Sequence, residues 1–436
     1  MTSANSILYK KLEFGPKQRV KTILFFTIVM ETLIVFGLPE YIRYINDLLL
    51  ISVLVTLKHD IFGVFRRASA SAYLAMALAF ALVCFFSGLL GAVSPLLMLW
   101  AFRNTFRGIV YVLCVVYYLR IEDIKRMFGA LFWLQIANLM LALYQFFVLH
   151  NNMDGVGGIF GMGNGAGVNA FNVLVCSYFF ASYLNHECSI VRPLVSIACA
   201  FVIAGVAEEK MSYLALTLVI VMSIFQMRFT LRKAVVVVLG IAAVMGGYTI
   251  LQQLYPDMFT IMSNVADLKD YLTGTVEGGY ELPRLGSFAV ISEMFFYGNP
   301  VRELLGIGFG GAETSSFDFL SSTFYDIFGY LHYRWFTHQW VFIETGWIGF
   351  TSLLLIFVVS LVCYHFGRRR GADTVLLLVG ICMALYCVMS LWYNATLKID
   401  MSYIAYFGIA VGFVASLPRL GKRSSACNQN SRIRKR

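Results

Sequence analysis

The sequence predicts an all-α integral membrane protein with about twelve membrane-spanning helices and one long helical loop outside the membrane. Hydrophobic residues make up 59% of the 436 residues and charged residues only 13%. Soluble domains contain roughly 45–50% apolar residues, so this chain belongs to a different class. Many of its apolar runs reach about 18 residues, which is the length that a helix needs to cross ~30 Å of hydrocarbon.

The apolar runs define the predicted spans and the domain organisation. The predicted spans are 22–38, 43–57, 70–92, 104–119, 127–149, 168–185, 190–207, 211–227, 234–250, 338–364, 373–393 and 401–417. They divide the chain into an N-terminal membrane bundle of about nine spans (1–250), a loop (251–337), C-terminal membrane spans (338–418) and a basic tail (419–436). The second span is short, and the stretch 93–103 is interpreted as a surface or re-entrant piece.

The basic residues indicate how the chain is oriented. With these spans, 25 of the 34 Lys and Arg residues fall on one side of the membrane and nine on the other. Cytoplasmic loops carry the excess of Lys and Arg in membrane proteins, so both termini are predicted to be cytoplasmic and the long loop to lie outside. The N-terminus shows no small-residue cleavage site after a short apolar core, and we expect a retained tail rather than a signal peptide.

Net charge and cysteine usage exclude two other classes of function. The net charge of +10 is explained by the cytoplasmic loops and by the tail, whose natural partners are anionic membrane lipids, so no nucleic-acid partner is predicted. The nine cysteines show no Cys/His spacing typical of a metal site, and none lies in the long loop. We expect buried, apolar cysteines, no metal and no cofactor.

The long loop carries the residues that are candidates for chemistry. Its charges sum to −6, yet it keeps Arg284 just after a proline. We expect one helix over Pro256–Leu272 and a second from Pro283 to about Tyr297, with Arg284 near its N-terminus, where an anion is favoured. The run 306–311 (GIGFGG) lacks the Lys-Ser/Thr of a phosphate loop, and we interpret it as a tight loop that permits close packing.

Two further motifs follow, and together with Arg284 they carry a family resemblance. Residues 299–311 read NPVRELLGIGFGG, and residues 338–350 read HQWVFIETGWIGF, with His338 first. With the Arg that precedes them, these motifs resemble those of the bacterial O-antigen ligase and Wzy-type polysaccharide polymerase superfamily. The similarity is strongest over residues 283–350 and weaker at 157–171 (GGIFGMGNGAGVNAF). Gln339 replaces the usual Asn, and an outer Ser-Arg-Gly of many members is replaced by Glu208, Glu209 and Lys210.

The resemblance implies a C-type glycosyltransferase fold in the bacterial inner membrane. Such an enzyme acts on undecaprenyl-diphosphate-linked oligosaccharides at the periplasmic face, with inversion at the anomeric carbon and without a metal. A hydroxyl of the acceptor sugar attacks the donor, and the lipid diphosphate leaves. The implied partners are the lipid-linked donor and acceptor and a chain-length regulator protein.

The resemblance and the chemistry together give each candidate site residue a role. Arg284 and Lys210 would stabilise the departing diphosphate, and His338 would either deprotonate the hydroxyl or bind a phosphate oxygen. Glu209, Glu344 and Glu208 are candidates for the base or for orienting His338, and Arg103 and Arg107 are further diphosphate or sugar contacts. The basic candidates also have structural alternatives. Arg284 could be solvated at a helix end or paired with Glu281, and Lys210 could be the ion-pair partner of Glu208 or Glu209. His338 could be an interfacial hydrogen-bond partner, and Arg103 and Arg107 could be interface anchors.

Four further residues stand out in the sequence, although no motif assigns them a role. Glu31 is a carboxylate within the first predicted span, where charged side chains are costly. Trp335, Trp340 and Trp347 lie near the candidate site and are suited to stacking on sugars.

The predicted function is the polymerisation of lipid-linked repeat units of a surface polysaccharide. The alternative within the same superfamily is an O-antigen ligase, which transfers finished glycan to lipid A–core. A transporter of lipid-linked oligosaccharides is a further alternative, but it would be expected to carry charges along several spans and repeated halves. A structural membrane scaffold would need neither Arg284 nor His338.

Overall fold

The computed structural model describes residues 14–57, 60–152, 155–226 and 281–417, together with single positions between 234 and 253. The described residues form helices joined by turns, with no strand among them, so the all-α prediction is confirmed for this part of the chain. The long helices are α1 (Pro16–Val35), α4 (Ser71–Leu90), α5 (Pro95–Tyr118), α6 (Ile121–Phe147), α7 (Gly165–Leu184), α8 (Val191–Val206), α9 (Lys210–Gln226), α16 (Thr337–Arg369), α17 (Thr374–Tyr393) and α18 (Ser402–Val414). The shorter ones are α2 (Ile45–Leu54), α3 (Ile61–Arg67), α13 (Ser287–Ile291), α14 (Pro300–Leu305) and α15 (Thr323–Phe328).

Six of these helices are long and apolar enough to cross a membrane, namely α4, α5, α6, α7, α16 and α17. In the predicted span 234–250 eight of the 17 residues are described, all of them helical, whereas the predicted helix at 256–272 and the basic tail lie outside the described residues. Each of the other eleven predicted spans overlaps a helix. Helix α2 has ten residues and rises only about 15 Å, half of a hydrocarbon layer, so the predicted span at 43–57 is too long.

The structure corrects the interpretation of residues 93–103. They are not a separate surface or re-entrant piece, because α5 runs without interruption from Pro95 to Tyr118. Pro95 occupies the first turn of the helix, where its missing N–H group costs nothing. Arg103 and Arg107 therefore lie one turn apart inside a long helix rather than at the end of one.

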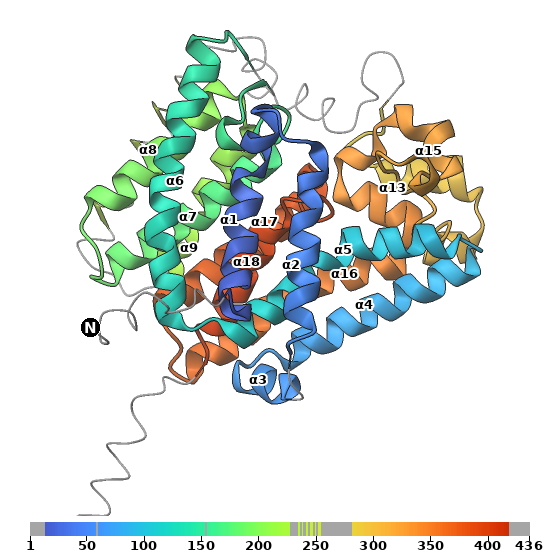
Figure 1. The fold of residues 1–436 in the computed structure, drawn as a ribbon, viewed down its shortest axis with the longest axis horizontal. Helices are drawn as coiled ribbons and strands as arrows, with labels where there is room; N and C mark the ends of the chain where they lie inside the picture. The colour runs from blue at the N-terminus through green and yellow to red at the C-terminus, as the bar shows by residue number, and fades with distance from the viewer. Residues whose placement is uncertain are drawn as a thin grey trace, which may run out of the picture.

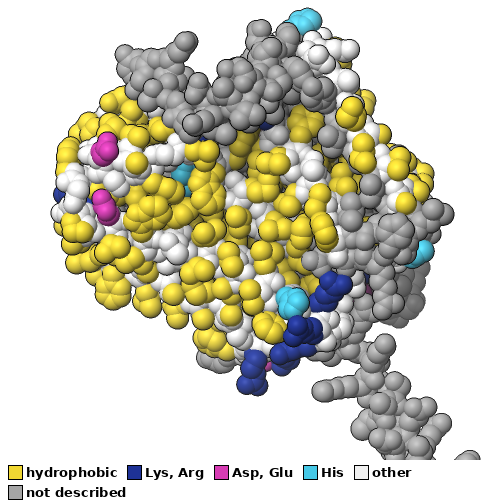
Figure 2. All heavy atoms as spheres, turned by 180° about the vertical axis from the view of Figure 1, so that it is seen from behind, with side chains coloured by type: hydrophobic (Ala, Val, Ile, Leu, Met, Phe, Trp, Pro, Cys, Tyr) yellow, Lys and Arg dark blue, Asp and Glu magenta, His cyan; other side chains and the backbone are white. Residues whose placement is uncertain are grey.

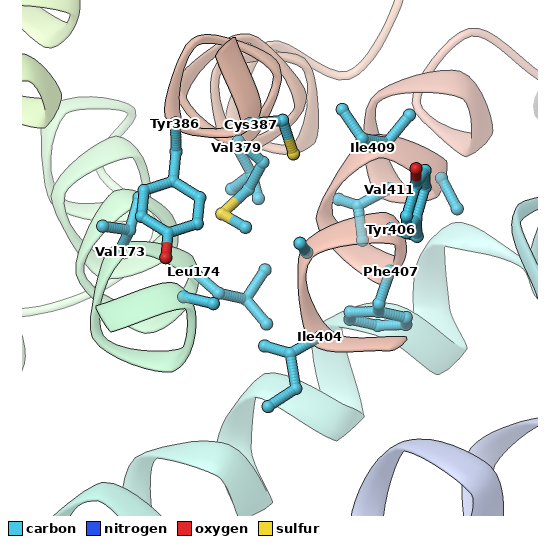
Figure 3. Packing of buried hydrophobic residues seen from close by; sticks show 14 of the residues in the cluster. Val173, Leu174, Val379, Tyr386, Cys387, Ile404, Tyr406, Phe407, Ile409 and Val411 are labelled. Carbon is cyan, nitrogen blue, oxygen red and sulfur yellow. The ribbon is translucent and has the colours of Figure 1, made fainter. Parts of the chain in front are cut away.

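The centre of the bundle is formed by α7, α17 and α18 (Figure 1, Figure 3). Every residue of α18 is buried, and so are 18 of the 20 residues of α7. Helices α17 and α18 approach closely at Gly380 and Gly412, where a Cβ built on Gly380 would lie 2.5 Å from the Cα of Gly412. Figure 3 shows Leu174, Ile404 and Phe407 among the side chains that fill the space between these helices.

The surface of the bundle is apolar, as expected for contact with lipid. Figure 2 shows one face on which hydrophobic side chains cover most of the described surface, while Lys and Arg gather at its lower edge. On α4, Leu78, Leu82 and Phe86 recur on every fourth residue and are 62%, 49% and 54% exposed. A soluble monomer rarely exposes contiguous apolar patches of this extent. This apolar surface and the six helices that could cross a membrane are compatible with a helical membrane protein.

Helix α16 is broken at Gly346, and the break binds the glycine-rich loop. The backbone of Gly346 has φ 59° and ψ −159°, which ends one helical segment and starts another. The break removes the helical donors for the carbonyl groups of Ile343 and Glu344, which accept instead from the N–H groups of Ile307 (2.9 Å) and Gly308 (3.2 Å). The hydroxyl of Ser87, on α4, also donates to the Glu344 carbonyl at 2.9 Å. The interpretation of residues 306–311 as a tight packing loop is thus confirmed.

Replacing Gly346 with alanine is expected to destabilise the protein by about 3 kcal/mol, because this backbone conformation is essentially restricted to glycine. The added Cβ would also lie 2.5 Å from the carbonyl oxygen of Glu303. Thermal unfolding of the purified protein in detergent measures the effect. Gly129→Ala is the matched control, since Gly129 lies within α6 with open space around it and alanine favours a helix. Equal unfolding temperatures for the two variants would contradict the prediction.

Candidate functional site

The candidate site residues gather around the α17–α18 loop, residues 394–401, which joins the end of α17 to the start of α18. The loop is fixed at its first residue, because the carbonyl of Asn394 accepts from the N–H group and the hydroxyl of Thr337 at 3.0 and 2.8 Å. Thr396 donates to the carbonyl of Ala166, at the start of α7, at 3.4 Å. The loop therefore joins the N-terminal end of α16 to that of α7.

Arg284 and His338 lie together at the end of α17. The Nε2 atom of His338 is 3.1 Å from the carbonyl oxygen of Arg284, and the guanidinium of Arg284 lies over the rings of Phe336 (5.1 Å) and Tyr393 (5.3 Å). Arg284 is partly exposed. The sequence expectation that Arg284 begins a helix is wrong: Gly286, with φ 87°, precedes α13, which starts only at Ser287. The end of that helix before Asn299 and Pro300 is as predicted, since a π-helical turn ends at Phe296.

His338 is completely buried at the start of α16. Its Nδ1 atom is 3.0 Å from the carbonyl oxygen of Leu391, and its Nε2 atom is 3.0 Å from the hydroxyl of Ser287. Together with the carbonyl of Arg284, these partners connect three segments of the chain through one imidazole. In this structure His338 holds the backbone at Arg284 in place.

Glu344 belongs to a buried cluster of charges. Its Oε2 atom is 2.6 Å from the Nζ atom of Lys398, which also lies 2.9 Å from the Oε1 atom of Glu313. All three side chains are at most 1% exposed. Burial alone lowers the pKa of Lys398, but the two carboxylates outweigh this effect and hold the pKa above its ordinary value. Gly310, in the glycine-rich loop, donates its N–H group to the Oε1 atom of Glu344 at 3.2 Å. Glu344 thus joins the two motifs, and Lys398 neutralises its carboxylate.

Arg103 and Arg107 each meet carboxylates of the protein itself. The Nε and Nη2 atoms of Arg103 both donate to the Oδ2 atom of Asp47, at 2.9 and 2.6 Å. Arg107 forms an ion pair with Asp400 and donates to the carbonyl of Lys398 at 3.0 Å. The two predicted anion contacts are therefore neutralised within the protein.

Glu31 has a defined partner as well. Arg43 binds it through two hydrogen bonds, Nε to Oε1 at 3.1 Å and Nη2 to Oε2 at 2.9 Å. Arg43 lies in the single 3₁₀ turn η1 (Glu40–Tyr44) after α1. This pair accounts for a carboxylate within an apolar helix.

Glu209 and Lys210 lie at the start of α9, next to the start of α7. The carboxylate of Glu209 lies against Gly165 and accepts from the side-chain amide of Asn169 at 2.7 Å. Lys210 forms an ion pair with Glu208 at 3.2 Å, which is the structural alternative considered for it in the sequence. All three charged residues are partly exposed. The loop contact between Thr396 and Ala166 places this group near the α17–α18 loop.

The tryptophans suited to stacking on sugars do not share one environment. Trp340 is buried, with the Nζ atom of Lys398 3.9 Å from its ring centroid and the guanidinium of Arg334 4.7 Å away. Trp347 packs against Phe288 at 4.8 Å and is 40% exposed. Trp335 is 51% exposed. Trp340 is therefore excluded as a sugar platform.

Sequence reasoning missed Lys398, Glu313, Asp47 and Asp400, which hold the motif residues in place. Each contact of Lys398 with the two glutamates joins positions far apart in the chain, so no local spacing reveals it. One signal was present: Lys398 and Asp400 lie in a short loop between two strongly apolar spans. Charged residues at such a position usually have a specific partner. The described cysteines are buried, as predicted, except for the partly buried Cys188.

Short motifs, rather than a whole domain, carry the resemblance described above. Comparison of the chain with models of protein families and with curated proteins gave no match.

Proposed function

We propose that this protein is a membrane glycosyltransferase that joins undecaprenyl-diphosphate-linked oligosaccharides into a surface polysaccharide. The reaction takes place at the periplasmic face of the bacterial inner membrane, with both termini of the chain in the cytoplasm. The resemblance in the Arg284, GIGFGG and HQWVFIETGWIG motifs supports the reaction class. The excess of basic residues on the opposite side supports the orientation.

The observation that carries the proposal is the placement of Arg284 beside the end of α17. Its guanidinium carbon lies 5.1 Å from the ring centre of Phe336 and 5.3 Å from that of Tyr393, and a guanidinium presents N–H donors in one plane. Planar N–H groups of this kind match the oxygens of a diphosphate. His338 fixes the backbone carbonyl of the same residue, so the position of the arginine is preset. Such preset positive charge stabilises a leaving group that gathers negative charge.

The proposed reaction is a displacement at the anomeric carbon of the donor sugar. An oxygen of the acceptor sugar attacks the anomeric carbon, the bond from that carbon to the diphosphate breaks, and the diphosphate keeps the electron pair. The proton of the hydroxyl passes to a carboxylate, for which Glu209 is the better candidate because it is partly exposed. Glu344 is buried and bound to Lys398, so we assign it a structural role. Lys210 lies next to Glu209 in the chain and contributes positive charge to the same region.

Deletion of the gene in its host tests the proposal through the surface-glycan profile. Loss of a polymerase is expected to leave single repeat units attached to lipid A–core, because the ligation step still operates. Accumulation of undecaprenyl-linked polymer with bare core would instead identify a ligase and contradict the polymerase assignment. An unchanged profile would contradict both. The purified full-length protein should also lengthen lipid-linked repeat units in the presence of EDTA, since the proposed step uses no metal.

A further inference from the structure

A cluster of rings and charges surrounds Arg103 at the other end of the α17–α18 loop. The guanidinium of Arg103 lies 5.2 Å from the ring of Tyr44 and 4.8 Å from that of Trp100. Phe317 stacks on Tyr44 at 6.2 Å and on Tyr41 at 6.0 Å. These rings come from three separate segments: the η1 turn, the start of α5 and the segment before α15. We call this group, with the ion pairs of Arg103 and Arg107 to Asp47 and Asp400, the Arg103 cluster.

The charges within the Arg103 cluster are balanced. Arg103 and Arg107 face Asp47 and Asp400, so two positive groups meet two negative ones. An anion such as a phosphate gains little from arginines whose charge is already matched. A neutral ligand with many hydroxyl groups suits the cluster better, because carboxylates keep acceptor sites and guanidiniums keep donor sites beyond their mutual contacts.

The Arg103 cluster is also partly open to its surroundings. The side chains of Arg103, Asp47 and Asp400 are 21%, 17% and 24% exposed, in contrast to the fully buried cluster of Lys398. Tyr41 is 62% exposed. Partly exposed charges beside the exposed ring of Tyr41 do not suit the hydrocarbon layer, where charged groups are costly. The C–H groups of a sugar, however, pack against the electron-rich face of an aromatic ring, and its hydroxyls bond to planar polar groups.

We infer that the Arg103 cluster is a saccharide-binding subsite for one of the two oligosaccharides that the protein joins. This inference rests on the proposed function, because a polymerase must hold a second saccharide besides the one whose diphosphate leaves. The guanidinium of Arg284 lies over Tyr393, at the end of α17, whereas the Arg103 cluster includes Asp400, just before α18. The two substrates would thus bind at opposite ends of one loop. The diphosphate of the donor would bind at Arg284, and the sugar rings of the other oligosaccharide would bind at the Arg103 cluster.

Calorimetric titration of the purified full-length protein in detergent tests the inference. The probe is the free repeat-unit oligosaccharide released by mild acid from the host's own surface polysaccharide. Tyr41→Ala is expected to weaken its binding roughly three- to tenfold, the size of one aromatic contact. Trp100→Leu should weaken it at least as much. Tyr297→Ala is the matched control, since Tyr297 is 78% exposed but belongs to the turn before α14, and it should bind as the wild type does.

The variant Arg284→Ala separates this inference from the proposed function. Because the free oligosaccharide carries no diphosphate, its binding should survive this substitution even when polymerisation is lost. Absence of binding to the wild type would overturn the inference, and so would equal binding by the wild type, Tyr41→Ala and Trp100→Leu. Inorganic pyrophosphate serves as the anion probe. If its binding, rather than that of the oligosaccharide, falls in Tyr41→Ala and Trp100→Leu, the cluster is an anion site and the inference is wrong.

Discussion

Replacing Arg284 with alanine is expected to abolish polymer ladders in a deletion strain while the protein stays in the membrane at its normal level. The guanidinium is partly exposed and stacks on two rings, so its loss should cost the fold only about 1 kcal/mol. Loss of a preset charge opposite a leaving group typically costs about 10²–10³ in rate. Electrophoresis of the surface glycans and immunoblotting of the membranes measure the two quantities.

Two further variants sharpen this experiment. Arg302→Ala removes an exposed arginine of α14, which follows α13 in the chain, and is expected to leave the ladders unchanged. Arg284→Lys keeps the charge but loses the planar donor groups, so short ladders are expected. Normal ladders in Arg284→Ala would remove this residue from the site, and the proposed function would lose the observation that carries it.

Lys398→Met is expected to have the largest effect on stability of any single substitution discussed. The change leaves Glu313 and Glu344 buried without their lysine, and removing one partner from a buried ion pair costs about 3–5 kcal/mol. The purified variant should unfold at a much lower temperature in detergent and accumulate poorly in membranes. Because Lys398 neutralises Glu344, which binds the glycine-rich loop to α16, activity should fall with stability.

A second lysine with two carboxylate partners provides the control. Lys125 lies 2.8 Å from Glu187 and 3.2 Å from Asp373, but its side chain is 28% exposed. Lys125→Met should therefore cost clearly less than Lys398→Met, because Lys125 and Glu187 are partly exposed and only Asp373 is buried. Combining Lys398→Met with Glu313→Gln and Glu344→Gln removes the unpaired charges and should restore part of the lost stability. A single Lys398→Met variant as stable as Lys125→Met would disprove the role of the cluster.

The sequence predicts the helices well where apolar runs are long and uninterrupted, as in α4, α6 and α17. The start of α5 was not predicted, because Arg103 interrupts its apolar run, so that the predicted span, which still contains Arg107, begins only at residue 104. These arginines are tolerated in the helix because Asp47 and Asp400 neutralise them. Those partners come from other elements, and the spacing of residues along one helix carries no information about them.

The candidate site could be predicted from the sequence only in part, because its contacts also depend on the tertiary fold. The motifs led to Arg284, His338 and Glu344, which do lie around one loop of the structure. Their partners were missed because each contact depends on the tertiary fold: the imidazole meets backbone carbonyls, and the carboxylate meets Lys398. The position of Arg284 before α13, rather than within it, follows from the left-handed conformation of Gly286, which delays the helix.

The break at Gly346 leaves a second helical segment whose length can be compared with the thickness of a bilayer. Residues 347–369 form the second part of α16, and at about 1.5 Å per residue they rise roughly 34 Å, close to the ~30 Å of a hydrocarbon core. A membrane span over residues 347–369 would put the first part of the helix, residues 337–345, in the headgroup layer. Glu344 and Lys398 would then lie at the depth of the lipid phosphates, where water can still solvate charged groups.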